Sequence, residues 1–258
     1  MHTMNGFMPY TFPLQPLKGG QWTVQLDPAY FTTREQEGNG GSLGPGPIDR
    51  LSGFGGAAGI DYAFNSHAAL GLLGAYFSGS GNQTGSNPYY QASESDKGSF
   101  DGLVAILDPF SGDGFRLPFV LAGGPLSAST TINYPAVSGG PSSGPAVTQT
   151  KAGNLGYMVG VDPQFNTGRY LRWEPFFQVT SVTEDSTCAG AECSNSPPTD
   201  SSPGASAGVN VVWRPYNLSF FYSPSFGDKS GTSVYALRWI RTFGGHRAKA
   251  APAQVRRP

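Results

Sequence analysis

The chain has 258 residues and a formal net charge of −1, which gives no reason to expect a nucleic acid as a partner. Glycine, with 37 residues, and proline, with 22, are too abundant for a helical architecture. Charged residues make up only 13% of the chain, about half the usual share for a soluble domain, whereas hydrophobic residues at 38% are enough to form a fold. We therefore expect one all-β domain with an unusual surface.

Apolar residues alternate with small or polar ones along most of the chain, and this period of two predicts β-strands. In the first segment, Trp22, Val24 and Leu26 lie on one face, and Thr23 and Gln25 lie on the other. About ten strands of about 9 to 12 residues, the length that crosses a bilayer at the usual tilt, are predicted. They cover residues 21–34, 53–64, 67–78, 99–109, 115–123, 155–162, 171–180, 207–214, 218–222 and 235–243.

The connections between these segments alternate between short and long, which predicts an antiparallel up-and-down sheet. Four similar junctions end a strand before a turn: Ile60-Asp61, Leu107-Asp108-Pro109, Val161-Asp162-Pro163 and Trp213-Arg214-Pro215. The short turns are residues 65–66, 111–114, 166–168 and 215–217. The long connections are rich in Gly, Ser, Asn, Pro and Thr and cover residues 35–50, 79–98, 126–153, 183–205 and 224–232.

Alternation alone does not say which face points outward, because a soluble lipocalin-like ligand-binding barrel has the same pattern with the faces reversed. Two features favour a membrane barrel. The second face consists mainly of Gly, Ala, Ser and Thr with one or two charges per strand, which suits a crowded interior better than a solvent face. Aromatic residues such as Tyr62, Trp173 and Trp239 gather near strand ends, where interfacial girdles lie in membrane barrels.

The last predicted strand, residues 235–243, is amphipathic and ends in Phe243. It is similar to the C-terminal strand of the bacterial outer-membrane β-barrel superfamily, although residues 244–258 follow it here. The resemblance covers residues 21–243. It implies an antiparallel up-and-down transmembrane β-barrel with short periplasmic turns and long extracellular loops, in the bacterial outer membrane, with lipid or lipopolysaccharide as its surroundings.

Outside the barrel we expect an N-terminal periplasmic arm, residues 1–20, and a basic Ala/Pro-rich periplasmic tail, residues 244–258. Residues 1–20 show no basic region followed by an apolar core, so no signal peptide is visible. An exported protein needs one. Either the sequence is the mature form, or its start is misassigned, or the membrane interpretation is wrong.

Eight charged residues are expected to face the interior. Three interpretations are open: structural ion pairs that fill a small barrel, a charged constriction in a porin-like channel, or catalytic carboxylates. About ten strands lie near the filled end of the range, but interior glycines such as Gly55 and Gly156 leave room for a thin channel. The eight are Asp61, Asp108, Asp162, Arg116, Arg172, Glu174, Arg214 and Arg238.

Cys188 and Cys193 lie close together in a polar stretch and are predicted to form a disulfide in an oxidising compartment. The alternative is a metal site with two thiolates, but no histidine lies nearby to complete a zinc shell. No cofactor or metal is expected.

Barrel enzymes of the omptin or lipid A-modifying type rely on histidine at the outer rim or within the outer leaflet. Here His2, His67 and His246 fall on the periplasmic side of the expected barrel. We therefore expect a non-enzymatic protein. Its role is either structural or loop-mediated binding at the cell surface, with a surface or periplasmic protein as partner, or that of a narrow channel.

Overall fold

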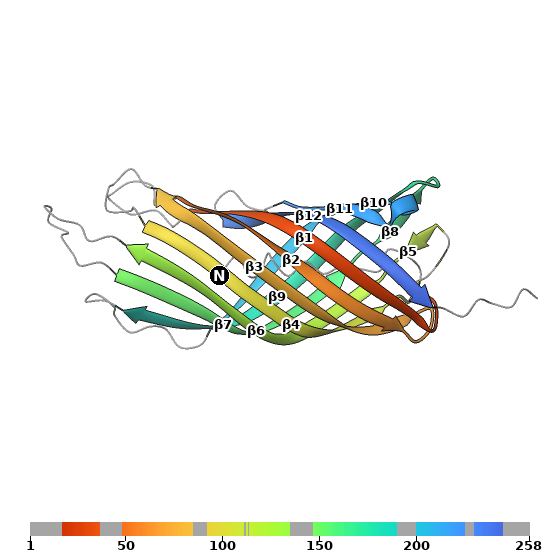
Figure 1. Ribbon diagram of the computed structural model, residues 1–258, viewed down its shortest axis with the longest axis horizontal. Helices are drawn as coiled ribbons and strands as arrows, with labels where there is room; N and C mark the ends of the chain where they lie inside the picture. The colour runs from red at the N-terminus through yellow and green to blue at the C-terminus, as the bar shows by residue number, and fades with distance from the viewer. Residues whose placement is uncertain are drawn as a thin grey trace, which may run out of the picture.

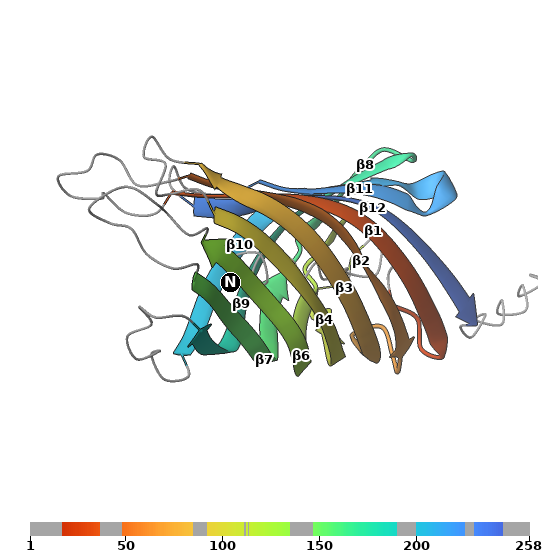
Figure 2. The same ribbon diagram turned by 60° about the vertical axis from the view of Figure 1, so that its left-hand side comes forward.

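The computed structural model describes residues 17–36, 48–84, 92–110, 112, 114–134, 147–189, 200–224 and 230–244, and these form a closed antiparallel β-barrel. Ten strands make the wall, in the order β1-β2-β3-β4-β6-β7-β9-β10-β11-β12, and β12 pairs with β1 to close it. The strands tilt strongly against the barrel axis (Figure 2). The predicted fold class is confirmed, and the soluble lipocalin-like alternative is not.

The wall strands are longer than the sequence pattern predicted, at 14 to 19 residues for nine of the ten. Their bounds are β1 Gln21–Gln36, β2 Ile48–Ala63, β3 Ala68–Thr84, β4 Ala92–Leu107, β6 Phe119–Tyr134, β7 Val147–Val161, β9 Leu171–Ala189, β10 Asp200–Trp213, β11 Leu218–Ser223 and β12 Ser230–Gly244.

Short turns join the strands at one end of the barrel, and the longer connections lie at the other end (Figure 1). Between β2 and β3, the Oδ1 atom of Asn65 accepts hydrogen bonds from the backbone N–H groups of His67 and Ala68. Between β10 and β11, the 3-10 turn η3, Arg214–Tyr216, ends at Asn217, whose φ of 50° is a left-handed conformation that asparagine tolerates. Among the described residues no helix is long and apolar enough to cross a membrane.

Two short strands extend the wall at the short-turn end (Figure 1). One lies at the start of the predicted strand 115–123, and the other reaches into residues 166–168, which were predicted to be a turn. β5, Phe115–Arg116, pairs with β8, Gln164–Thr167, and β8 pairs with β9. The predicted strand 115–123 is interrupted before Pro118, which has no backbone N–H to donate. This extension brings Arg116 and Gln164 over the mouth of the barrel.

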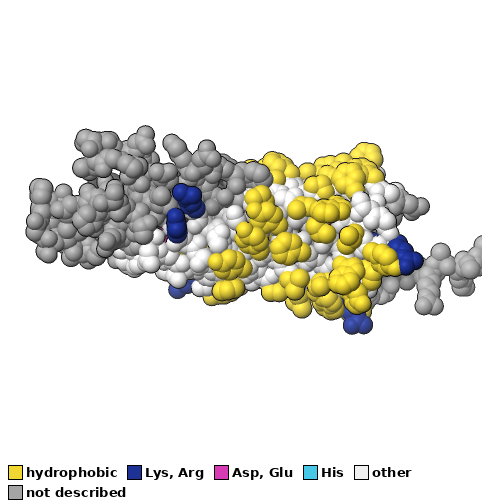
Figure 3. Space-filling model, turned by 90° about the horizontal axis from the view of Figure 1, so that it is seen from above, with side chains coloured by type: hydrophobic (Ala, Val, Ile, Leu, Met, Phe, Trp, Pro, Cys, Tyr) yellow, Lys and Arg dark blue, Asp and Glu magenta, His cyan; other side chains and the backbone are white. Residues whose placement is uncertain are grey.

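A belt of hydrophobic side chains surrounds the half of the barrel that carries the short turns (Figure 3). Trp22, Phe119, Val159 and Leu237, on four different strands, are 47%, 38%, 54% and 51% exposed, so they point outward and do not form a core. Without lipid, such a continuous apolar surface would be far larger than soluble proteins tolerate. The prediction that the apolar face of the strands points outward is therefore confirmed.

Aromatic clusters border the belt on both sides, as interfacial girdles do in membrane barrels. Near the short turns, the rings of Trp22 and Tyr62 lie 4.9 Å apart, and those of Trp213 and Tyr216 lie 4.7 Å apart. Toward the loop end, Tyr30 lies 5.1 Å from Phe54 and 6.4 Å from Tyr235. The membrane-facing part of the wall lies between these two girdles.

The strands continue past the loop-side girdle into segments that the sequence analysis assigned to loops. On β3 the outward residues change from Leu72 and Tyr76 to Ser78, Ser80 and Asn82, all exposed. This part of the wall faces water, so the outward positions no longer need to be apolar. The hydrophobic alternation that marks a lipid-facing strand therefore ends although the strand itself continues.

Candidate functional site in the barrel interior

A cluster of charged and amide side chains occupies the short-turn mouth of the barrel. The Nε atom of Arg116 donates to Oδ2 of Asp108 at 2.8 Å, and its Nη1 atom donates to Oε1 of Gln164 at 2.9 Å. The Nε2 group of Gln164 lies 3.4 Å from Oδ2 of Asp162 and donates to it. All four side chains are buried. The extension by β5 and β8 thus places at the mouth a buried ion pair that the amide of Gln164 links to Asp162.

A second ion pair lies on the inner face of β9. Arg172 and Glu174 are two residues apart, so both point inward, and Nε of Arg172 donates to Oε1 of Glu174 at 2.7 Å. The neighbouring strand β10 contributes Asn210, whose Nδ2 group donates to Oε2 of Glu174. Both carboxylate oxygens of Glu174 are therefore satisfied, as a fully buried carboxylate requires.

The third pair joins the two ends of the sheet. Nε of Arg238 on β12 lies 3.3 Å from Oδ1 of Asp27 on β1, and both side chains are buried. The guanidinium carbon of Arg238 also lies 5.2 Å from the ring centre of Phe221, a cation–π contact. This pair forms only when the barrel is closed, because β1 and β12 are neighbours only then.

The three pairs form one electrostatic network. Asp162, which follows β7 at the mouth, interacts with Glu174, Arg238 and Arg172. Burial raises the pKa of the Asp162 carboxyl well above its ordinary value, and the negative charge of Glu174 raises it further. The hydrogen bond from Gln164 and the two arginines act in the opposite direction.

Two of the eight predicted interior charges are placed differently from the rest. Arg214 was expected in the interior, but it is exposed on η3, where its Nη1 group lies 3.5 Å from the carbonyl oxygen of Gly168. The turn begins at this residue, so the alternation of β10 no longer sets its direction. Asp61 on β2 does face inward, beside Thr23 and Gly71, and its Oδ1 atom has no hydrogen-bond partner within the described part of the chain.

Three members of the network were absent from the predicted set: Asp27, Asn210 and Gln164. Each occupies an inward position of the alternating pattern, so their direction was readable from the sequence. Their partners were not, because Asp27 meets Arg238 only where β1 pairs with β12, and Gln164 meets Arg116 only where β8 pairs with β5. Asn210 meets Glu174 through the register of β9 with β10, which the alternation alone does not fix.

Phenylalanine rings fill the interior toward the loop end, and they lie against glycines of neighbouring strands. A Cβ atom at Gly53 or Gly79 would lie 2.7 Å from Cζ of Phe31, and one at Gly98 would lie 2.7 Å from the ring of Phe77. Phe176 lies in the same way against Gly208. Because the rings use the space that these glycines leave, a larger residue at any of these glycines would displace a ring.

The aromatic side chains are packed together and shut off from water. Phe31 meets Phe77 edge to face at 6.3 Å, and Phe176 stacks on Phe221 at 4.6 Å. Phe31, Ile106, Val120 and Val182, which come from four strands around the wall, are each 0% exposed. The thin channel was predicted from interior glycines such as Gly55 and Gly156. Four other glycines, Gly53, Gly79, Gly98 and Gly208, receive aromatic rings in the structure.

The remaining candidate groups give no catalytic arrangement within the described residues. His67 lies in the exposed β2–β3 turn, where Nδ1 is 2.8 Å from the carbonyl oxygen of Asp108. Among these residues no group of three His, Cys, Asp or Glu side chains could hold a metal ion. The backbone of Cys188 pairs with Gln149 of β7. Cys193, His2 and His246 lie outside the described residues, so the disulfide stays a prediction.

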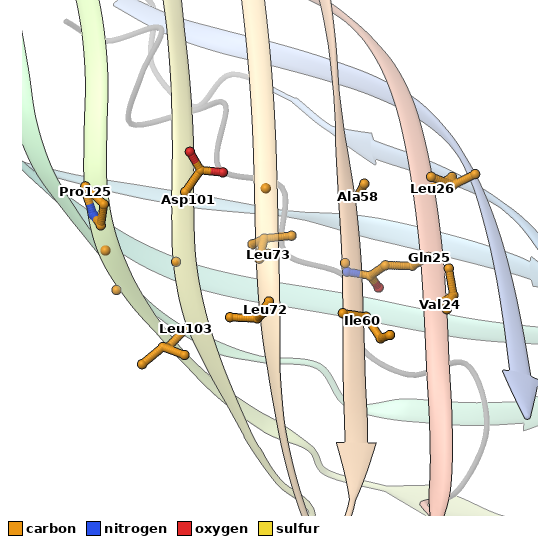
Figure 4. Close-up of a pocket in the computed structure, with 15 residues that line it drawn as sticks. Val24, Gln25, Leu26, Ala58, Ile60, Leu72, Leu73, Asp101, Leu103 and Pro125 are labelled. Carbon is orange, nitrogen blue, oxygen red and sulfur yellow. The ribbon is translucent and has the colours of Figure 1, made fainter. Parts of the chain in front are cut away.

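The outer wall carries a groove of about 640 Å³ within the lipid-facing belt (Figure 4). It forms where Ala58, Gly74 and Gly123 present little side chain between Leu26, Leu72 and Leu103. Asp101 and Pro125 lie at its end toward the loops, at the point where the direct pairing of β4 with β6 is interrupted. The small residues thus hollow the outside of the wall.

Comparison with solved structures identifies the fold. The transport unit of the autotransporter AIDA-I from Escherichia coli is 12% identical, with 94% of this chain and 96% of that chain covered and a TM-score of 0.55. The translocator domain of the autotransporter NalP from Neisseria meningitidis is 10% identical, with 86% and 87% covered and a TM-score of 0.54.

No family model and no curated protein matches the sequence. At these identities the likeness shows the fold alone, which is that of a bacterial outer-membrane β-barrel. The lipid-facing belt and its two aromatic girdles agree with a location in the bacterial outer membrane.

Proposed function

We propose that this outer-membrane β-barrel is a non-enzymatic, non-conducting scaffold that presents its extracellular connections for binding at the cell surface. The observation that carries the proposal is the buried interior. Toward the loops it consists of aromatic rings seated on glycines, and toward the short turns it is occupied by paired charges. A barrel of about this size is ordinarily filled by its own side chains.

The ion pairs support a structural role for the interior charges. In a selective constriction, charged groups must remain available to passing ions. Here the guanidinium groups of Arg116, Arg172 and Arg238 are each committed to a buried carboxylate. The same commitment argues against catalytic carboxylates, because Glu174 and Asp108 have no open side toward a substrate.

Planar-bilayer recording tests the proposal. We expect the purified full-length protein to insert without discrete conductance steps in salt solutions at neutral pH. The double variant Phe31→Ala/Phe77→Ala removes the packed rings but leaves the ion pairs at the short-turn mouth in place, so we expect it to insert without conductance steps as well. Steps from the wild-type protein that change ion selectivity in Arg172→Gln would establish the narrow channel instead.

Surface binding is tested on whole cells. Replacing the connection at residues 135–146 with a Gly/Ser linker of equal length should abolish adhesion to the partner surface and leave barrel assembly unchanged. The control is Arg169→Ser, which changes an exposed residue of a turn at the opposite end of the barrel and should not affect adhesion. Equal adhesion of both variants and of cells without the protein would argue against a binding role.

A further inference from the structure

Two arginines lie directly opposite each other on the outside of the wall. Arg34 of β1 and Arg50 of β2 are partners in the antiparallel register, and both side chains are exposed. Like charges directly opposite each other across two strands are destabilising. Among the side chains that the structure describes, which do not include those of Glu35 and Asp49, no carboxylate forms an ion pair with either arginine. Such a pair becomes favourable when an anion lies between the two guanidinium groups.

The surroundings of the pair suit an anion. A surface hollow of about 300 Å³ is lined by both arginines and by Thr32, Thr33, Leu51, Ser52 and Ser233. Guanidinium N–H groups and hydroxyls are the donors that phosphate oxygens accept from in proteins. Asp and Glu are absent from the lining residues, so the hollow contains no described group that would repel an anion.

The position of the arginine pair relative to the membrane indicates which molecule carries the anion. Arg34 lies four positions after the loop-side girdle residue Tyr30, and Arg50 lies four positions before Phe54. Both are on the side away from the belt, because the two strands are antiparallel. Figure 3 shows Lys and Arg side chains beyond the loop-side edge of the hydrophobic belt. Four residues of a tilted strand span on the order of 10 Å, so the two arginines lie outside the hydrocarbon core, on its polar side.

We propose that Arg34 and Arg50 together bind a phosphate group of an outer-leaflet lipid, the phosphorylated lipid A headgroup of lipopolysaccharide. The proposal rests on the outer-membrane location of the scaffold but not on its closed interior, so a conducting barrel would leave it intact. It also explains why a chain with few charges places two of them opposite each other on an outer surface.

Lipid binding can be measured on the full-length protein in a neutral detergent by native mass spectrometry. The probes are diphosphorylated lipid A and the same lipid A with both phosphates removed. We expect wild-type protein to bind the phosphorylated form about tenfold more tightly, and the variant Arg34→Ser/Arg50→Ser to lose about that factor. Arg169→Ser, which removes an exposed arginine from a turn at the opposite end of the barrel, should bind like the wild type.

The unfolding temperature provides a second readout, because the difference between wild type and variant should change sign when phosphorylated lipid A is added. In detergent alone, Arg34→Ser/Arg50→Ser should unfold at the same or a higher temperature than wild type, because the like-charge contact is removed. With phosphorylated lipid A present, the wild type should be the more stable protein. A purely structural role for the arginines predicts that the variant is less stable in both conditions.

Three outcomes would overturn the proposal. The first is equal binding of the two lipid A forms, and the second is unchanged binding by the double variant. The third is stabilisation of the wild type, but not of the variant, by millimolar inorganic phosphate without lipid, which would identify a site for the free ion. None of these results depends on whether the barrel conducts.

Discussion

The two halves of the barrel differ in which face of the wall is apolar. In the half with the short turns, Trp22, Leu26 and Leu72 face outward, and Arg172 and Glu174 face inward. In the half with the loops, Ser78, Ser80 and Asn82 face outward, and Phe31 and Phe77 face inward. The medium outside the wall determines the outward side chains, because lipid requires apolar ones and water allows polar ones. Where water surrounds the wall, burial of apolar side chains in the interior contributes to stability through the hydrophobic effect.

The largest expected effect comes from breaking an interior pair in the lipid-surrounded half. Glu174→Leu should lower the free energy of unfolding by about 3 to 5 kcal/mol, because it leaves the buried Arg172 without its carboxylate. Urea unfolding in lipid vesicles measures the change. Arg214→Leu is the matched control and should have almost no effect, because Arg214 is exposed. Equal losses in both variants would contradict the placement of the two side chains.

In the water-surrounded half the interior should respond to volume instead of charge. Phe31→Ala should cost about 3 kcal/mol, since it removes a ring that fills the space above Gly53 and Gly79. The control is Phe54→Ala, which truncates an outward ring on the adjacent strand and should cost clearly less. If the two truncations cost the same in urea titrations, Phe31 does not belong to a packed core.

Two substitutions on the outer surface of β3 test where the boundary between the two halves lies. Leu72→Arg places a charge in the lipid-facing belt and should cost about 2 to 3 kcal/mol in vesicles. Ser80→Arg, eight positions further along β3, faces water and should be neutral. Heat-dependent migration on gels and urea unfolding would both report the difference. A neutral Leu72→Arg would move the membrane boundary away from its present position.

The smallest expected effect concerns Asp162. Because burial raises its pKa in the folded barrel, its ionisation opposes folding, and stability falls as the pH rises from the ordinary carboxyl pKa near 4 toward the raised value. Asp162→Asn should therefore gain about 1 kcal/mol at neutral pH and match the wild type near pH 3. Urea titrations at several pH values give both quantities. A variant that is destabilised at neutral pH would show that the ionised carboxylate is stabilising.

Much of the lipid-facing half could be predicted from the sequence. Alternation around residues such as Leu26 and Val159 requires no knowledge of partners, because lipid imposes the same demand on every outward position. The mouth of the barrel was predicted less well. Arg214 follows the alternating pattern of β10, but the chain turns at that residue and its side chain leaves the interior.

The water-facing half could not be predicted in the same way. Past Ser78, outward positions are free to be polar and inward glycines alternate with them, so the sequence from Ser78 to Thr84 has the composition of a loop. The seating of Phe31 on Gly79 joins residues from β1 and β3, and only the registers of β1, β2 and β3 bring them together. An isolated glycine in the sequence gives no sign of the ring that covers it.

The pair between Arg238 and Asp27 has a consequence for assembly. The two residues lie on the last and first strands, and each is charged on a stretch of wall that lipid surrounds. In an unclosed sheet the two would lose each other as counter-ions within the membrane, at a cost of several kcal/mol. Insertion therefore has to proceed together with closure of the first strand onto the last, so that the seam forms as the chain leaves water and not after it.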